Sequence, residues 1–424
     1  MSTAAHTHLE TTCCIAGGGP AGMMLGLLLA RAGVHVTILE KHHDFLRDFR
    51  GDTVHPSTLE LLYELGLDEA FRRRPHQEVT RVGASVNGIH AILADVSHLP
   101  VHHPKVVLMP QWDFLDFLVE QARCYPTFHL HMVSNVTDLL WEGDSVAGVI
   151  AQTPEGELHV HAALTVGADG RHSVVRERAK LEVISDAADI DVLWMRLSRK
   201  PDDPDEMLGH LRPGRFLVTI NRDEYWQCAF VIPKTGLDQL RAGGLEAFRE
   251  KIAETAPFLR DRTCELKDWD QIKLLSVTVD HLKQWWRPGL LCIGDSAHAM
   301  SPVGGVGINF AIQDAVATAN LLGARLLVNN VKPEHLALVQ RRREWPVRLT
   351  QRVQLFLHRR LILPTVSGES SANGTGTHLP LVLRLTQRFP VLRRIPGRAV
   401  GLGPRPEHVQ SPNAFPSPLA LLKT

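Results

Sequence analysis

Gly17-Gly18-Gly19-Pro20-Ala21-Gly22 is the stretch of sequence that decides the fold. It follows a short apolar run at residues 12–16, and its last residues open a longer apolar run that ends near Arg31. Gly33 then precedes a third apolar run at residues 34–40. A strand, a glycine turn, a helix with proline in its first turn and a second strand together form a βαβ unit. This order predicts an α/β fold around a parallel sheet.

The spacing of Gly17, Gly19 and Gly22 is the G-x-G-x-x-G pattern of turns that hold a dinucleotide pyrophosphate. Glycine lets the backbone approach the phosphates, and the start of the following helix offers them free N–H groups. Glu40 comes 18 residues after Gly22, at the end of the second strand, where a carboxylate can accept hydrogen bonds from ribose hydroxyls. The motif predicts a bound dinucleotide but does not separate FAD from NAD.

A second segment, Val-Gly-Ala-Asp-Gly-Arg-His-Ser at residues 166–173, ends an apolar run and enters a short helix. Taken alone, an Asp-Gly turn with Ser173 as helix cap is a common connection between a strand and a helix. Taken alone, the second segment therefore does not indicate a binding site; it does so only in combination with the first and third segments.

A third segment, residues 290–309, is harder to explain as structure alone. Its strand ends in Gly294-Asp295, which places one carboxylate where a sugar-alcohol hydroxyl could reach it. Three glycines at positions 304, 305 and 307 then precede a long helix, although each costs backbone entropy on folding. Such a run lets the backbone lie against a flat ring, and the helix start stabilises negative charge on that ring.

The composition disfavours several classes of protein. Lys plus Arg (46) equals Asp plus Glu (46), so there is no overall positive field to hold nucleic acid. No apolar run reaches the ~18 residues of a transmembrane helix, and the first residues lack the pattern of a leader sequence. The 23 histidines and 6 cysteines show no recurring metal-ligand spacing, so no metal site is expected. We expect a cytoplasmic protein with reduced thiols.

The apolar runs indicate two domains that are interleaved along the chain. The three glycine segments belong to a dinucleotide-binding domain, and mixed strand-like and helix-like runs between them belong to a substrate-binding β-sheet domain. A linker rich in Gly, Ser and Thr leads into a basic, apolar C-terminal tail. The expected bounds are 10–75, 109–184 and 276–350 for the first domain, 76–108 and 185–275 for the second, and 351–424 for the tail, with the linker at 367–378.

In this order and at these separations, the three segments resemble the para-hydroxybenzoate hydroxylase family of single-component (group A) FAD-dependent monooxygenases, over about residues 12–350. Pro110-Gln111-Trp112 resembles the family's helix start whose polar side chain contacts FAD. Arg50-Gly51-Asp52, followed by His55-Pro56, resembles the stretch that places an arginine near the cofactor. The resemblance implies a Rossmann-like FAD-binding domain of the GR2 type, an inserted mixed-sheet substrate domain and a C-terminal helical segment.

The resemblance also implies roles for individual residues. The glycines of the first motif would hold the ADP half of FAD, and Glu40 its ribose. Asp169 would serve both FAD and NAD(P)H, and Asp295 would meet the ribityl and pyrophosphate region. Pro302 would lie near the reactive face of the isoalloxazine, as the one catalytic residue, and residues 305–309 would line its pyrimidine edge. The implied cofactor-binding set is Gly17, Gly19, Pro20, Ala21, Gly22, Glu40, Lys41, Arg50, Gln111, Val136, Asp169, Gly170, Gly294, Asp295, Pro302, Gly305, Gly307, Ile308 and Asn309.

The reaction that the resemblance implies has two halves. NADPH or NADH reduces non-covalently bound FAD, and dioxygen then forms a flavin hydroperoxide that passes one oxygen atom to the substrate. We expect a small hydrophobic, aromatic or polycyclic substrate and a monomer or homodimer. Positioning and water exclusion are the protein's main tasks, so no general base is assigned. His298, three residues after Asp295, is expected to be packed or on the surface.

Three other functions fit part of the sequence. A flavin-dependent halogenase is disfavoured, because the stretch nearest to its W-x-W-x-I-P signature, residues 228–233, has neither tryptophan. A flavin reductase or dehydrogenase stays open, because the same binding segments serve reactions without oxygen insertion. A non-catalytic FAD-binding protein would also keep the glycine segments. Aromatic residues such as Trp194 and Phe216 could line a ring-binding pocket or fill the core, and no arginine pair clearly marks a carboxylate-bearing substrate.

Overall fold

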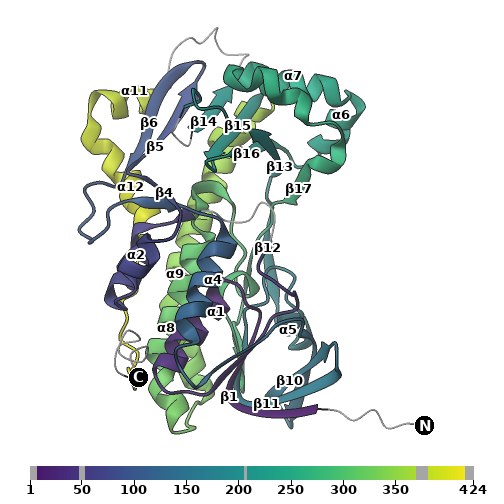
Figure 1. Cartoon of the computed structure of the whole chain (residues 1–424), viewed down its shortest axis with the longest axis vertical. Helices are drawn as coiled ribbons and strands as arrows, with labels where there is room; N and C mark the ends of the chain where they lie inside the picture. The colour runs from purple at the N-terminus through teal and green to yellow at the C-terminus, as the bar shows by residue number, and fades with distance from the viewer. Residues whose placement is uncertain (1–6, 47–52, 205–207, 369–380, 416–424) are drawn as a thin grey trace.

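The glycine turn lies where β1 (Thr7–Ala16) meets α1 (Pro20–Arg31), within a parallel array of strands (Figure 1). The second strand of the unit, β2 (Val36–Leu39), pairs parallel with one side of β1, and β11 (Gly156–Gly167) pairs parallel with the other. The βαβ unit expected from the sequence is confirmed. The computed structural model describes residues 7–46, 53–204, 208–368 and 381–415.

Within those ranges the first sheet has eight strands, in the order β19-β20-β11-β1-β2-β8, with β10 paired antiparallel to β11 and β9 paired antiparallel to β10. Its first strand starts five residues earlier than the expected residue 12. Residues 7–11 pair with residues 158–162 of β11, but both stretches mix polar and apolar side chains, so the apolar pattern did not mark them. The other strands are β8 (Phe128–His131), β9 (Asn135–Glu142), β10 (Ser145–Thr153), β19 (Trp286–Arg287) and β20 (Leu290–Cys292).

Helix α1 is buried along most of its length, as its apolar sequence predicts. Small residues let it approach the sheet closely. A Cβ added at Gly26 would lie 2.5 Å from Cδ1 of Ile38, and one added at Gly22 would lie 2.0 Å from the carbonyl oxygen of Gly17. The backbone oxygen at Gly22 cannot move aside, so glycine is required there, whereas a side chain at Gly26 would force the end of Ile38 to shift.

A second sheet lies above the first in Figure 1 and is mixed, as expected. In the described chain its order is β17-β13-β16-β15-β14-β5-β6, and β14 and β5 are its parallel pair. Leu193 and Met195 of β13 pack against α7, whereas Val192 and Trp194 point to the other face. The elements are β5 (Arg81–Val86), β6 (Ile89–Asp95), β13 (Ile190–Ser198), β14 (Leu208–Arg212), β15 (Arg215–Asn221), β16 (Tyr225–Pro233), β17 (Lys273–Ser276), α6 (Gly236–Ala242), α7 (Leu245–Thr255), η1 (Pro257–Glu265) and η2 (Trp269–Gln271).

Shorter elements connect the two sheets. A small sheet of order β3-β7-β4 lies between them, and α4 packs against α1 on the first sheet. These elements are β3 (Thr53–Val54), β4 (Gln77–Val79), β7 (Val106–Leu108), β12 (Val183–Asp186), β18 (Val279–Leu282), α2 (Pro56–Glu64), α3 (Asp68–Arg72), α4 (Gln111–Ala122), α5 (Val174–Arg178), η3 (Gly294–Ser296) and η4 (Val303–Gly305).

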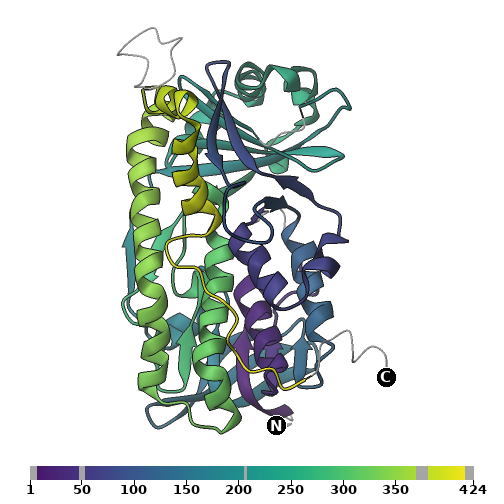
Figure 2. The same cartoon turned by 90° about the vertical axis from the view of Figure 1, so that its left-hand side faces the viewer.

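Two long helices, α8 (Gly307–Leu327) and α9 (Pro333–Leu357), pack against each other; α8 lies beside the first sheet, and α9 runs on toward the second (Figure 2). Helix α9 continues through residue 350, so the boundary expected there falls inside a helix. Residues 367 and 368 form a bend, and the rest of the expected linker lies outside the described residues. The domain bounds stay predictions. The C-terminal elements are η5 (His358–Ile362), a π-helical turn, α10 (Leu363–Val366), α11 (Leu381–Arg388), η7 (Pro390–Arg393) and α12 (Arg394–Gly401).

Candidate active site

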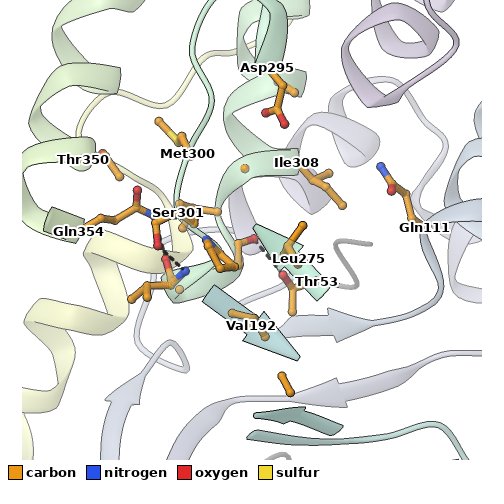
Figure 3. A pocket seen from close by; sticks show the side chains of 18 of the residues that line it. Thr53, Gln111, Val192, Leu275, Asp295, Met300, Ser301, Ile308, Thr350 and Gln354 are labelled. Atoms are coloured by element: carbon orange, nitrogen blue, oxygen red, sulfur yellow. Dashed lines mark hydrogen bonds between the residues drawn. The ribbon is translucent and has the colours of Figure 1, made fainter. Parts of the chain in front are cut away.

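A large cavity lies between the two sheets and takes its walls from both. Its volume is about 2050 Å³, well above the ~300–1,000 Å³ of a pocket for one drug-sized ligand. The glycine turn and residues 168–172 line one end, and the second sheet lines the other. Figure 3 shows Asp295 and Gln111 toward the first end and Val192 and Leu275 toward the second. The cavity therefore has room for two organic molecules.

The glycine turn forms one edge of the cavity. Gly17, Gly19, Pro20 and Ala21 line it, whereas Gly22 lies behind them against Gly17. No atom lies within 4 Å of a Cβ added at Gly19, so that position faces open space. The start of α1 thus borders the cavity, where a helix N-terminus favours an anionic group.

Glu40 lies beside the glycine turn at the cavity wall. Its Oε2 accepts a hydrogen bond from the backbone N–H of Gly18 (2.8 Å), and its Oε1 accepts one from the N–H of His42 (3.1 Å). These bonds hold the carboxylate beside the glycine turn, and its predicted contact with a ribose stays a prediction. Of the other predicted residues, Lys41, Gln111, Val136 and Gly170 line the cavity, and Arg50 lies outside the described residues.

Two carboxylates from different strand ends also line the cavity. Oδ2 of Asp169 accepts a hydrogen bond from the N–H of Val175 (3.1 Å), while its Oδ1 is buried and has no partner among the described residues. Burial raises the pKa of Asp169 above its ordinary value. Oδ2 of Asp295 lies 3.6 Å from the guanidinium of Arg171. Because an unpaired buried oxygen is costly, Asp169 fits a ligand that donates a hydrogen bond to it.

Pro302, Gly305, Gly307 and Ile308 bring the third segment to the cavity wall. Gly305 has a φ of +62°, and a Cβ there would lie 2.4 Å from Oγ1 of Thr53. Both facts require glycine, because an L side chain would be strained and would also collide. The backbone thus comes to the cavity surface just before α8 begins.

Gly294 and Asn309 lie behind this wall. Oδ1 of Asn309 accepts hydrogen bonds from the N–H of His55 (3.1 Å) and from Oγ1 of Thr58 (2.7 Å), while its Nδ2 is buried without a partner among the described residues. The N–H of Gly294 donates to Oδ2 of Asp314 (3.0 Å). Both residues therefore support the wall from behind.

Asp314 on α8 is the centre of a buried charge network behind the Gly-Asp segment. Its Oδ2 lies 2.5 Å from Nε2 of His298, and its Oδ1 accepts a hydrogen bond from Nε of Arg343 on α9 (2.9 Å). Arg343 also bonds Glu407 (3.2 Å). Burial raises the pKa of Asp314, but His298 and Arg343 outweigh it and hold the pKa below its ordinary value. His298 is buried, as expected for a packed histidine.

Comparison with known proteins now decides the family. A family model described as "FAD binding domain" matches residues 10–352. A 6-methylpretetramide 4-monooxygenase from Streptomyces rimosus is 34% identical over 388 residues, which cover 91% of this chain and 92% of that protein. The chain belongs to the FAD-dependent monooxygenases of the para-hydroxybenzoate hydroxylase-like group. FAD is its cofactor and NAD(P)H its reductant, as the resemblance implied.

Solved structures share the fold of this monooxygenase. OxyS anhydrotetracycline hydroxylase from Streptomyces rimosus matches with a TM-score of 0.70 at 23% identity, covering 97% of this chain and 79% of that one. PqsL, a probable FAD-dependent monooxygenase from Pseudomonas aeruginosa, matches with a TM-score of 0.70 at 20% identity, covering 86% and 98%. In the described part of the monooxygenase, no helix is long and apolar enough to cross a membrane.

The second sheet gives the monooxygenase an apolar cavity wall. Alternate residues of its strands, including Val192, Trp194, Phe216, Val218 and Val231, line the cavity, and their neighbours pack against α7. Opposite them, the C-terminal half of α9 supplies further apolar side chains. The sequence analysis left open whether Trp194 and Phe216 line a pocket or fill the core, and the position of α7 on the other face settles that they face the cavity.

A pair of residues that the sequence reasoning missed adjoins Pro302. Oγ of Ser301 lies 2.7 Å from Nε2 of His358, and both side chains are buried. The amide of Gln354 holds the segment by donating to the carbonyl oxygens of Ser301 (3.0 Å) and Val303 (2.8 Å) (Figure 3). His358 opens the π-helical turn η5, a feature often found at functional sites. Burial lowers the pKa of His358, which favours the neutral form of its imidazole.

Two arginines were also missed. Arg212, at the end of β14, and Arg360, in η5, both line the cavity. No spacing in the sequence links them, since they lie on different elements, and the chain segments next to them meet through the hydrogen bond from Gly214 N–H to the carbonyl oxygen of Thr365 (2.7 Å). In the described ranges, no three His, Cys, Asp or Glu side chains gather as metal ligands.

Proposed function

We propose that this FAD-dependent monooxygenase transfers one oxygen atom from dioxygen to a polycyclic aromatic substrate that lies beside the flavin in the same cavity. The observation that carries the proposal is the cavity itself, about 2050 Å³ in volume and lined by glycine and carboxylate groups at one end and apolar side chains at the other. The relative named for 6-methylpretetramide supports a substrate of several rings.

We assign FAD to the glycine end. There the start of α1 would face the pyrophosphate, and Glu40 would face the ribose. Asp295 would bind the ribityl chain, and Asp169 would accept a hydrogen bond through its unpaired Oδ1. Pro302 and the backbone from Gly305 would lie along the isoalloxazine. Bound FAD supplies the redox chemistry, taking hydride from NADPH or NADH and activating dioxygen.

We assign the substrate to the wall formed by the second sheet. Trp194 and Phe216 offer flat apolar surfaces for rings, and Val192 and Val231 fill the space between them. This wall excludes water from the reacting atoms and holds the substrate in one orientation. Arg212 would meet oxygen substituents of the substrate.

We also keep the two-domain organisation as part of the proposal. Residues 10–75, 109–184 and 276–350 would form the FAD-binding unit, and residues 76–108 and 185–275 the substrate unit. Two sheets with separate cores support this division. A monomer or homodimer remains the expected assembly.

The experiment compares two phenylalanines on opposite faces of the second sheet. Phe216→Ala removes a ring from the cavity wall and enlarges the cavity. Because the substrate loses this contact, we expect a higher KM for 6-methylpretetramide with unchanged FAD content. Phe230 packs toward α7, so Phe230→Ala should lower the melting temperature instead, by an amount equivalent to about 3–5 kcal/mol of stability. Turnover of polycyclic compounds that is unaffected by Phe216→Ala contradicts the substrate assignment.

A further inference from the structure

The opening of the cavity is flanked by an unusual stretch of surface. Residues 345–368 contain four arginines, residues 381–406 contain six, and neither stretch contains an aspartate or glutamate. The chain as a whole has no net charge, so this excess of positive charge is local. We call the exposed side chains of these two stretches the C-terminal surface.

Large apolar side chains are exposed on the C-terminal surface. On α9 and η5 they are Trp345 (56% exposed), Leu349 (39%), Val353 (50%), Phe356 (61%) and Leu361 (57%). With 3.6 residues per turn, the four on α9, together with Arg348 and Arg352, fall within an arc of roughly 140°. One side of α9 is therefore both apolar and basic.

The segment α11–α12 repeats this pattern. Leu385 (42%), Phe389 (54%), Val391 (64%), Leu392 (38%) and Ile395 (70%) are exposed there. Figure 2 shows this segment, drawn in yellow, beside the upper part of α9 on one side of the molecule. Apolar patches of this kind mark contact surfaces in soluble proteins.

Most arginines of the C-terminal surface have no partner within the protein. In the described part of the chain, the side chains of seven of the ten make no hydrogen bond or ion pair. A guanidinium with no internal partner is free to bind an external anion, and its aliphatic stem can lie along apolar surface. The seven are Arg352, Arg360, Arg384, Arg388, Arg394, Arg398 and Arg405.

We propose that the C-terminal surface binds the anionic face of a lipid bilayer. Interleaved arginines and bulky apolar residues are the composition of segments that lie in the membrane interface, with the apolar groups below the headgroups and the cations among the phosphates. A second copy of this chain fits the surface less well, because a two-fold interface would bring two copies of the same basic surface together with no acidic residue in either stretch to pair with the arginines.

The cavity opens on the same surface. Leu349, Val353 and Phe356 are exposed and also line the cavity, and Ala399 and Val400 of α12 line it from the other side. If the proposed function holds, a polycyclic substrate dissolved in the bilayer reaches the flavin through this opening. Membrane binding itself does not depend on the identity of the substrate.

The test is flotation of the purified flavoprotein with vesicles. We expect it to float with phosphatidylcholine vesicles that contain phosphatidylglycerol and not with phosphatidylcholine alone, and to be released by high salt. Near an anionic surface each arginine is worth about fivefold in binding, so Arg388→Glu/Arg394→Glu should weaken binding by about 25-fold or more. Ile395→Glu should also release the protein from the vesicles.

The control pair is Lys267→Glu/Lys273→Glu, which makes the same change of charge near β17, at the edge of the second sheet opposite β6. FAD content and melting temperature confirm that each variant is folded. Failure of the wild-type protein to bind the anionic vesicles overturns the proposal. Equal loss in the control pair also overturns it, since binding would then reflect total charge. A third outcome also overturns the proposal: the wild-type protein does not bind vesicles, and light scattering shows a dimer that Ile395→Glu abolishes. The C-terminal surface would then bind a second copy of the chain.

Discussion

Gly19 and Gly22 belong to one motif but have different surroundings. A Cβ at Gly22 would lie 2.0 Å from the carbonyl oxygen of Gly17, whereas nothing lies within 4 Å of a Cβ at Gly19. We predict that Gly22→Ala destabilises the fold, while Gly19→Ala leaves the melting temperature of the FAD-free protein nearly unchanged and weakens FAD binding. Thermal unfolding and flavin content measure the two effects. Equal melting temperatures for the two FAD-free variants would contradict this reading of the turn.

Asp295 is predicted to bind FAD directly. A hydrogen bond to a charged group is worth roughly 1.5–3 kcal/mol, so Asp295→Ala should raise the Kd for FAD about 10- to 100-fold. Asp295 is only partly buried and contacts Arg171, so little stability should be lost without FAD. Flavin titration measures the affinity, and an unchanged Kd would remove Asp295 from the site.

His55 makes the free energy of unfolding of the protein depend on pH. Its ring is buried and its Nδ1 lies 2.9 Å from the carbonyl oxygen of Val400. Burial lowers the pKa of His55 from 6.5 to about 4. The unfolded chain therefore binds the proton first, and stability is lost as pH falls from 6.5 toward 4. The contribution is about 3 kcal/mol.

The measurement is urea unfolding at pH 4 and pH 7. His55→Gln should reduce the difference in unfolding free energy between the two pH values by about 3 kcal/mol. His43→Gln is the control, because the side chain of His43 is 82% exposed. The same pH dependence in wild type and His55→Gln would show that His55 is not the group concerned.

At the scale of elements, Asp314 joins α8, α9 and the Gly-Asp segment. Removing one partner of a buried charge network leaves the others uncompensated, at a cost of about 3–5 kcal/mol. We therefore predict that Asp314→Ala lowers stability by this amount and also lowers FAD retention, because Gly294 loses its acceptor. Arg341→Ala on the exposed side of α9 is the control and should change neither. If Asp314→Ala lost stability but kept full FAD affinity, the charge network would not help to shape the FAD site, contrary to this prediction.

The elements that could be predicted from sequence are those with a local pattern. The unit β1–α1–β2 follows from apolar periodicity and from the glycines that only a turn or a close packing explains. The pair Ser301 and His358 could not be found in this way. The two residues are 57 positions apart, and His358 stands in a π-helical turn whose offset breaks the helical period.

At the scale of the whole molecule, the sequence indicates which residues lie near the site, but not which side of the cavity wall each of them occupies. Gly294 and Asn309 are predicted to bind the cofactor, and this stays a prediction: in the structure they lie just behind the cavity wall, where Gly294 bonds Asp314 and Asn309 bonds His55. Trp194 was recognised as a ring-binding or core residue, and only the position of α7 on the other face decides that it lines the cavity. The cavity arises from contacts between distant segments, which no local pattern records.

The central claim is that one cavity holds FAD and a polycyclic substrate together. We would incubate the purified flavoprotein with NADPH, oxygen-18 gas and 6-methylpretetramide, and analyse the product by mass spectrometry. The account predicts a product that carries one oxygen-18 atom, formed at a rate reduced by Phe216→Ala. Consumption of NADPH with no labelled product, from this compound or from any other polycyclic aromatic, would contradict it.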